Sequence, residues 1–206
     1  MGDITMKNNW EIRKNQKEAE LRMVKLLEKI YPEEYKLIKR IAEDERFFDK
    51  DFDIIGHHIN GGMHLFEVKN DEQISKYGNI YAEFVVYYAD GSIDVGWLNK
   101  SVADYMLYID KVNDKTYLFE LNDLRTYIIK NNPQIKSSPD FAEDENGNEY
   151  LMKYVIAYLV PIKDFMKYTT VYEINNKKYL ETQELEQSSL LRPFHKNKRR
   201  KEDNND

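Results

Sequence analysis

The sequence predicts an α/β protein, with N-terminal helices packed on a mixed β-sheet of the α+β kind. Apolar residues recur at helical spacing near the N-terminus. Most of the remaining chain is rich in Val, Ile, Phe and Tyr and is punctuated by Gly, Asn and Asp, which is typical of strands and turns. The two patterns together indicate helices that cover a sheet.

Two helices are expected before the first strand. The first begins at Trp10 or Glu11 and is interrupted at Pro32, and Glu20 lies at the upstream end of its apolar stripe. The second covers residues 33–47. The apolar stripes consist of Met23, Val24, Leu27 and Ile30 in the first helix and of Tyr35, Ile38 and Ile41 in the second.

Residues 51–69 are predicted to form a β-hairpin that turns at Asn60, Gly61 and Gly62, because an Asn-Gly pair between β-rich segments is a strong hairpin signal. A three-residue loop at these positions pairs Ile59 with Met63.

This register places Asp53 opposite Lys69, with Glu67 one diagonal step away, and all three side chains share one face. A two-residue loop would put Asp53 on the opposite face from the other two side chains.

The rest of the chain alternates strands with two short helices. Strand segments are expected at 80–91, at 105–109 and at 116–121, followed by a helix over 121–131 that Asn122 or Asp123 is able to cap. Further on we expect a polar loop over 131–149, a strand over 150–161, a short helix over 162–166, and a terminal hairpin that turns at Asn175 and Asn176.

Length and composition favour one domain. With 206 residues, 41% of them apolar, the chain is able to bury a substantial core. We expect a single domain over residues 10–190, a mobile loop over 131–149, and disordered segments at 1–9 and 191–206. Cysteine is absent, which excludes disulfides, Cys-based zinc sites and thiol nucleophiles. Without a signal-peptide core or a membrane-length apolar run, a cytoplasmic protein is expected.

Two carboxylates and an ammonium at one end of a hairpin suit hydrolysis of a nucleic-acid backbone. Hard oxygen ligands such as Asp53 and Glu67 bind Mg²⁺ or Mn²⁺ together with substrate phosphate. A nearby Lys such as Lys69 is able to position the nucleophile or to stabilise developing negative charge.

The pattern Asp53, thirteen intervening residues, then Glu67-Val68-Lys69 resembles the PD-(D/E)XK nuclease superfamily, including its small phage and bacterial members. Phe52 stands where the naming Pro would be. The resemblance implies a restriction-endonuclease-like core and Mg²⁺-dependent DNA hydrolysis. It further implies metal binding by Asp53, Glu67 and the Val68 carbonyl, with Lys69 as the residue that orients water.

The resemblance also implies roles for residues outside the hairpin. A helix before the first strand commonly supplies another Glu in this superfamily, which points to Glu20 as an additional catalytic residue. Lys100 and Ser101, before the strand at 105–109, correspond to a polar stretch close to substrate. Glu83 is a secondary candidate, since a carboxylate on the strand after the E-x-K tripeptide contributes to the site in some relatives.

Several alternatives remain open at this point. A net charge of −6 favours modest rather than tight binding of nucleic acid. A catalytically silent module of a phage or mobile element, which keeps the fold and binds a nucleic acid or host protein, is the second interpretation. A homodimer is compatible with the sequence, and the residues do not specify DNA against RNA or the mode of cutting. The sixteen tyrosines fit half-buried sheet surfaces better than base stacking.

Overall fold

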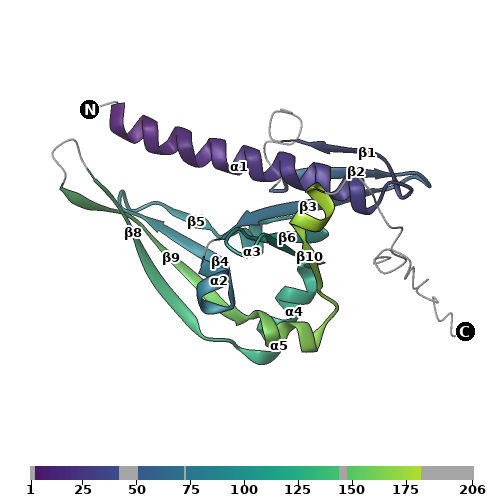
Figure 1. Ribbon diagram of the computed structural model, residues 1–206. Coiled ribbons are helices and arrows are strands. Elements are labelled where there is room, and N and C mark those ends of the chain that lie inside the picture. Colours follow the sequence, from purple (N-terminus) through teal and green to yellow (C-terminus); the bar gives the residue numbers. More distant parts are fainter. Residues whose placement is uncertain (1–2, 42–50, 72, 144–147, 182–206) are drawn as a thin grey trace, which may run out of the picture.

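The computed structural model describes residues 3–41, 51–71, 73–143 and 148–181, and within them the chain is an α/β protein with two sheets (Figure 1). This confirms the predicted fold class. The helices are α1 (Asp3–Ile30), α2 (Gln73–Tyr77), α3 (Trp97–Lys100), α4 (Leu121–Asn131), α5 (Ile162–Tyr168) and α6 (Asn176–Glu181). The strands are β1 (Tyr35–Arg40), β2 (Ile54–His58), β3 (Met63–Asn70), β4 (Asn79–Tyr88), β5 (Ile93–Val95), β6 (Tyr105–Asp110), β7 (Lys115–Glu120), β8 (Ile135–Glu143), β9 (Glu149–Pro161) and β10 (Tyr172–Asn175).

The larger sheet has six strands in the order β1-β2-β3-β6-β7-β10. It is mixed, because β3 and β6 run parallel whereas the other neighbours are antiparallel. The smaller sheet is antiparallel and has the order β5-β4-β9-β8. The parallel pair β3 and β6 lies in the middle of the larger sheet, where strands are buried on both faces.

Helix α1 covers one face of the larger sheet (Figure 1). It begins at Asp3, earlier than predicted, so residues 3–9 are helical rather than disordered. Its buried stripe packs against Phe66 and Val68 of β3 and Leu107 of β6. This stripe consists of Ala19, Glu20, Met23, Leu26 and Leu27, with Tyr31 just after the helix.

The predicted second helix is wrong where the structure describes it, because residues 35–40 form strand β1 at the edge of the sheet. A β-bulge between Tyr35 and Leu37 adds a residue to one strand, so that Tyr35 and Ile38 are both buried. Buried residues three positions apart are also typical of a helix, which explains the error. Residues 42–47 of the prediction lie outside the described residues.

The hairpin β2–β3 forms as predicted, but its register differs. Ile54 pairs with Phe66 and His57 with Met63. The N–H of His58 donates to the Gly62 carbonyl at 3.2 Å, which leaves the three-residue loop at 59–61 rather than 60–62. The register has therefore moved by two residues from the predicted one.

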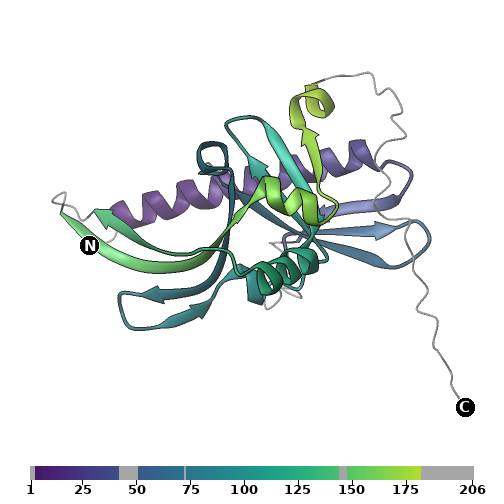
Figure 2. The same ribbon diagram turned by 90° about the horizontal axis from the view of Figure 1, so that it is seen from below.

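The strands of the smaller sheet extend to the same side of the molecule as the N-terminal half of α1 (Figures 1 and 2). The predicted loop over 131–149 is wrong at residues 135–143, which form β8. This strand lies at the sheet edge and pairs only with β9, a position in which Pro139 is tolerated.

A second core lies on the opposite face of the larger sheet from α1. It joins Ile55, Met106 and Phe119 of that sheet to α3, α4, α5 and the smaller sheet. Helices α4 and α5 and strands β4, β6, β7 and β9 confirm the predicted elements. Asn122 and Asp123 do not cap α4, whose cap residue is Glu120, and the predicted terminal hairpin is wrong because Asn176 begins α6.

Two further predictions concern the ends of the chain and its relation to membranes. The expected disordered tail, 191–206, lies outside the described residues. Within the described ranges, no helix combines the length and the apolar character needed to cross a membrane.

Candidate active site

The carboxylates of Asp53 and Glu67 share one face of the β2–β3 hairpin. Because Ile54 pairs with Phe66, the residues next to that pair, Asp53 and Glu67, stand opposite each other. The predicted pairing of Asp53 with Lys69 is therefore wrong. The predicted common face is correct, because a shift of two residues preserves the alternation of side chains.

The side chain of Asp53 extends the hydrogen bonding between these strands. Its backbone N–H donates to the Phe66 carbonyl at 2.9 Å, and its Oδ2 accepts the N–H of Val68 at 2.8 Å. A carboxylate oxygen thus takes the place of a backbone acceptor where the ladder ends. This contact fixes Asp53 beside the E-x-K tripeptide.

Lys69 lies next to Glu67 on the same face of β3. Its Nζ is 2.7 Å from Oε1 of Glu67, and it lies 5.8 Å from the ring centroid of Trp97 in α3. The Glu67 residue is buried, with 4% of its surface exposed, whereas 31% of the Lys69 side chain is exposed. The structure thus brings together the three residues that the motif predicts.

Burial changes the acid–base properties of this cluster. Desolvation is the largest effect on Asp53, and together with the charge of Glu67 it raises the pKa of Asp53 to about 7. Burial by itself would lower the pKa of Lys69, but the negative charges of Glu67 and Asp53 outweigh it and raise that pKa. At neutral pH the cluster therefore contains a protonated Lys69, and the Asp53 carboxyl group titrates in this pH range.

Ser101 holds the second oxygen of Glu67. Its Oγ lies 3.3 Å from Oε2 of Glu67 and 2.7 Å from the Asp51 carbonyl oxygen. The Ser101 carbonyl in turn accepts a 2.6 Å hydrogen bond from Arg125 of α4. Ser101 is 3% exposed, so the structure gives it a positioning contact to Glu67.

Lys100 points elsewhere. Its Nζ lies 3.1 Å from Oδ2 of Asp51, and 49% of its side chain is exposed. The structure records no contact of Lys100 with Asp53, Glu67 or Lys69 among the described residues. Lys100 therefore lies at the rim of the cluster.

Glu20 is buried, as its position on the apolar stripe predicts, and 2% of its surface is exposed. Its Oε2 is paired with Nε of Arg40 at the end of β1. Its charge contributes to the raised pKa of Asp53, although less than burial and Glu67 do. Glu20 thus lies near the cluster but is engaged by Arg40.

The Val68 carbonyl faces helix α1. It accepts a 3.2 Å hydrogen bond from the side-chain amide of Gln16, one turn before Glu20. Neither Gln16, Arg40 nor Arg125 was predicted to support the site. Each acts through a contact between elements that are distant in sequence, and no local pattern marks such contacts.

Glu83 of β4 approaches the cluster from the smaller sheet. Burial raises the pKa of this carboxyl, and the positive charges of Lys69 and Lys153 oppose that rise. Glu83 and Tyr81 lie on the same face of β4, because side chains alternate along a strand. Lys69 is therefore electrostatically linked to carboxylates on both sheets.

The donor set fits a hard divalent cation. Asp53 and Glu67 would supply carboxylate oxygens, and the Val68 carbonyl, which already accepts a hydrogen bond from Gln16, would contribute its second lone pair. The raised pKa of Asp53 reports the repulsion and desolvation that a cation would relieve. Across the described part of the chain, no three His, Asp or Glu side chains converge to hold a metal by themselves.

The three histidines of the hairpin do not join this cluster. His58 and His64 lie with their ring centroids 6.0 Å apart, and Tyr35 shares a 2.7 Å hydrogen bond with Nδ1 of His64. His57 pairs with Met63. The rings of His58 and His64 thus serve as partners of the buried Tyr35.

Comparison with known proteins gives no relative for this chain: no family model, no curated protein and no solved structure matches it.

Proposed function

We propose that this protein is a Mg²⁺-dependent nuclease that hydrolyses DNA phosphodiester bonds at the cluster of Asp53, Glu67 and Lys69. The observation that carries the proposal is the convergence of Asp53 and Glu67 on one face of β2–β3, with Lys69 2.7 Å from Glu67. Two adjacent half-buried or buried carboxylates are unfavourable unless they bind a proton or a cation. Their presence in this cluster is therefore support for a functional site.

In this proposal each residue has a defined task. Asp53, Glu67 and the Val68 carbonyl hold Mg²⁺ or Mn²⁺, which when bound polarises the phosphoryl oxygen and lowers the pKa of water. Lys69 keeps its proton, orients the attacking water and offsets negative charge on phosphorus-bound oxygens. The hydroxyl of Ser101 fixes the orientation of Glu67.

The surrounding residues have supporting tasks. Lys100, exposed at the rim, is suited to contact a phosphate of the substrate, as the resemblance implies. The catalytic role expected of Glu20 is revised to a positioning role, because Arg40 already engages its carboxylate. Glu20 would then act by setting the position of α1 over the hairpin and by its charge on Asp53.

The decisive experiment is cleavage of a panel of supercoiled, linear, branched and single-stranded DNA with Mg²⁺ or Mn²⁺. Wild type is compared with Lys69→Met, which keeps the aliphatic stem but removes the ammonium. Lys167→Met is the matched control, since its ammonium pairs with Asp164 at 2.8 Å on the exposed side of α5. Cutting by wild type and by the control, but not by folded Lys69→Met, is the expected result.

A second function is favoured by one observation. Both oxygens of Glu67 have partners in the chain, Lys69 and Ser101, so this carboxylate is satisfied without a cation. A catalytically silent module of the same fold, which binds a nucleic acid or host protein, would need only these contacts within the chain and no metal ion.

Thermal unfolding separates the two functions. A nuclease site predicts that Mg²⁺ or Mn²⁺ raises the melting temperature of wild type and leaves that of Asp53→Ala unchanged. Indifference of both proteins to either cation, together with no cutting of any substrate, would favour the binding module.

A further inference from the structure

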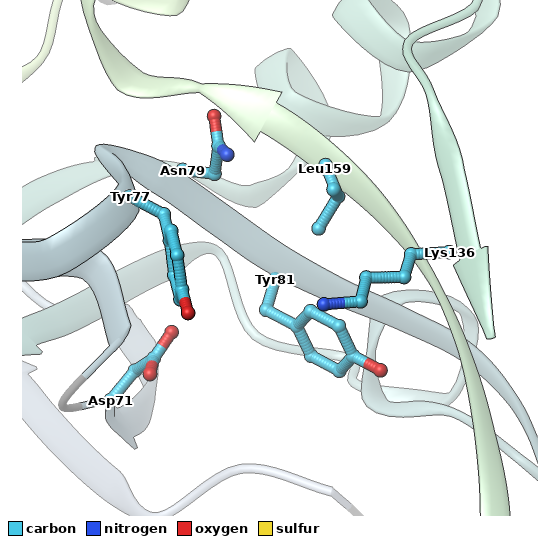
Figure 3. A pocket seen from close by; sticks show the side chains of 6 residues that line it. All are labelled: Asp71, Tyr77, Asn79, Tyr81, Lys136 and Leu159. Carbon is cyan, nitrogen blue, oxygen red and sulfur yellow. The ribbon is translucent and has the colours of Figure 1, made fainter. Parts of the chain in front are cut away.

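A pocket of about 130 Å³ lies between the smaller sheet and helix α2 (Figure 3). Strands β4, β8 and β9 provide most of its wall, and the end of α2 closes it. Its lining residues are Asp71, Tyr77, Asn79, Tyr81, Lys136 and Leu159. None of them belongs to the cluster of Asp53, Glu67 and Lys69.

Two tyrosine rings and an aliphatic side chain form the walls of this pocket. Figure 3 shows the rings of Tyr77 and Tyr81 on neighbouring sides and the Lys136 side chain reaching in from β8. The Tyr81 hydroxyl donates to the Val155 carbonyl at 3.3 Å, which holds that ring against the sheet. Tyr77 is 57% exposed, so its ring is accessible to a partner.

Hydrogen bonds of the buried Tyr108 join the pocket wall to the strand beside the proposed active site. Tyr108 of β6 is the register partner of Lys69, and its hydroxyl donates to the carboxylate of Asp71 at the pocket wall. The N–H of Tyr81 donates to the same hydroxyl at 3.0 Å. Pocket and cluster are therefore fixed to each other by Tyr108.

Strand β4 makes a second connection. Tyr81 lines the pocket, and Glu83, two residues further along the same face, interacts electrostatically with Lys69. Two residues of a strand span roughly 6.6 Å. A ligand that lies along β4 can therefore occupy the pocket and the cluster together.

We propose that this pocket receives an unpaired nucleobase of the strand whose phosphodiester lies at Asp53, Glu67 and Lys69, so that the substrate is single-stranded or locally splayed. The inference rests on the proposed nuclease function and deepens it by naming the substrate class. Aromatic faces bind bases of any identity, and an ammonium beside them adds attraction to the ring system. Lys136 supplies such an ammonium.

A phosphate group is a poorer occupant of the pocket. The carboxylate of Asp71 lines it and offsets the ammonium of Lys136, so the pocket has no net positive charge to attract an anion. A base, by contrast, offers amino and imino N–H groups that a carboxylate accepts. The pocket therefore selects the base, and the phosphates remain on the side of Lys69.

The test uses fluorescence anisotropy of the full chain carrying Lys69→Met, so that binding is measured without cutting. Three labelled probes are compared: a single-stranded oligodeoxynucleotide, the matching duplex, and a strand of equal length whose residues are all abasic. Tyr77→Ala is introduced into this protein, with Tyr77→Phe as the variant that keeps the ring. Tyr87→Ala is the matched control, because Tyr87 is also exposed and lies on β4, but its partner Tyr154 places it on the opposite face from Tyr81 and Leu159.

The single strand is expected to bind more tightly than the duplex, and Tyr77→Ala to weaken its binding by about tenfold, within the range measured for base stacking. Tyr77→Phe and Tyr87→Ala should stay within about twofold of the parent protein, since they keep the ring or lie on the other face. The abasic strand should bind weakly and should be insensitive to Tyr77→Ala.

Two results would overturn the inference. Equal binding of the abasic and the normal strand, or indifference of the single strand to Tyr77→Ala, would mean that no base enters the pocket. If wild type nevertheless cuts DNA in a Lys69-dependent manner, the nuclease function stands and only the pocket assignment fails. If no probe binds and wild type cuts no DNA, both fail.

Discussion

The ammonium of Lys69 lies 2.7 Å from Oε1 of Glu67, two residues before it on the same face of β3. Ser101 contacts the other oxygen of this carboxylate, so both Glu67 oxygens have partners. Asp53, opposite Glu67, has a pKa that rises to about 7. The ionisable behaviour of the cluster near neutral pH is therefore set by Asp53.

Replacement of Asp53 by Asn should stabilise the cation-free protein above neutral pH. The folded-state pKa of about 7 exceeds the ordinary value of 3.8, so the stability contributed by protonated Asp53 is present in full below about pH 4. It is lost as the pH rises through 7. Asn keeps an acceptor for the Val68 N–H but carries no charge.

We expect Asp53→Asn to exceed wild type by ~4 kcal/mol in the free energy of unfolding at pH 8, because the pKa rises by about three units and each unit corresponds to about 1.4 kcal/mol. The difference should shrink toward pH 4.5 in chemical denaturation measured without divalent cations. Asp164→Asn, on the exposed side of α5, is the control. A difference independent of pH would contradict the titration assigned to Asp53.

Ser101→Ala should impair catalysis more than folding. Loss of the hydroxyl removes the contact to Glu67 and one buried hydrogen bond to the Asp51 carbonyl, at a cost of roughly 1 kcal/mol in stability. If the hydroxyl positions Glu67, we expect kcat for DNA cleavage to fall about tenfold with little change in KM. Ser92→Ala, in an exposed turn, should leave both unchanged. Loss of stability with normal kcat would reduce Ser101 to a structural residue.

Glu20→Gln should destabilise the protein strongly, because it leaves the partly buried guanidinium of Arg40 without its carboxylate. Breaking a buried ion pair from one side typically costs about 3 kcal/mol. The double variant Glu20→Leu with Arg40→Met should recover most of that loss in thermal unfolding.

The same double variant tests the positioning role of Glu20. Cleavage by the refolded double variant within a few-fold of wild type is the expected result, because neither side chain would touch metal or substrate. Complete loss of cutting in a stable double variant would return Glu20 to the catalytic set.

Gly96→Ala should prevent close approach of α3 to β4. A Cβ at this position would lie 2.3 Å from the Glu83 carbonyl oxygen, and backbone atoms cannot move aside as a side chain can. We expect a loss of about 3 kcal/mol in the free energy of unfolding. Gly56→Ala is the comparison, because its Cβ would meet a side-chain ring carbon of Tyr35 at 2.7 Å instead of backbone atoms. A larger loss at Gly56 than at Gly96 would contradict this account.

The central hairpin and its charged residues were predictable because their signals are local. The Asn-Gly turn, the β-rich flanks and the alternation along Glu67, Val68 and Lys69 are all read within twenty residues. The register of the hairpin was not predictable, because a glycine pair allows the turn to close at either of two positions. Gly61 and Gly62 both have φ of +86°.

The errors elsewhere have physical causes. Strand β1 looked helical because a bulge put its buried residues three apart. Strand β8 looked like a loop because an edge strand needs only one partner and tolerates Pro139. The contacts of Gln16, Arg40 and Arg125 join segments that are far apart in the chain, and only the folded topology brings them to the cluster.

The odd length of the β2–β3 turn has a consequence for insertions and deletions. If one residue were added between His58 and Gly62 while the loop kept three residues, the pairing would shift by one residue and Asp53 would turn to the face of α1, away from Glu67. Two added residues would leave Asp53 on its present face. Length variation in this loop should therefore be tolerated in pairs of residues and not singly.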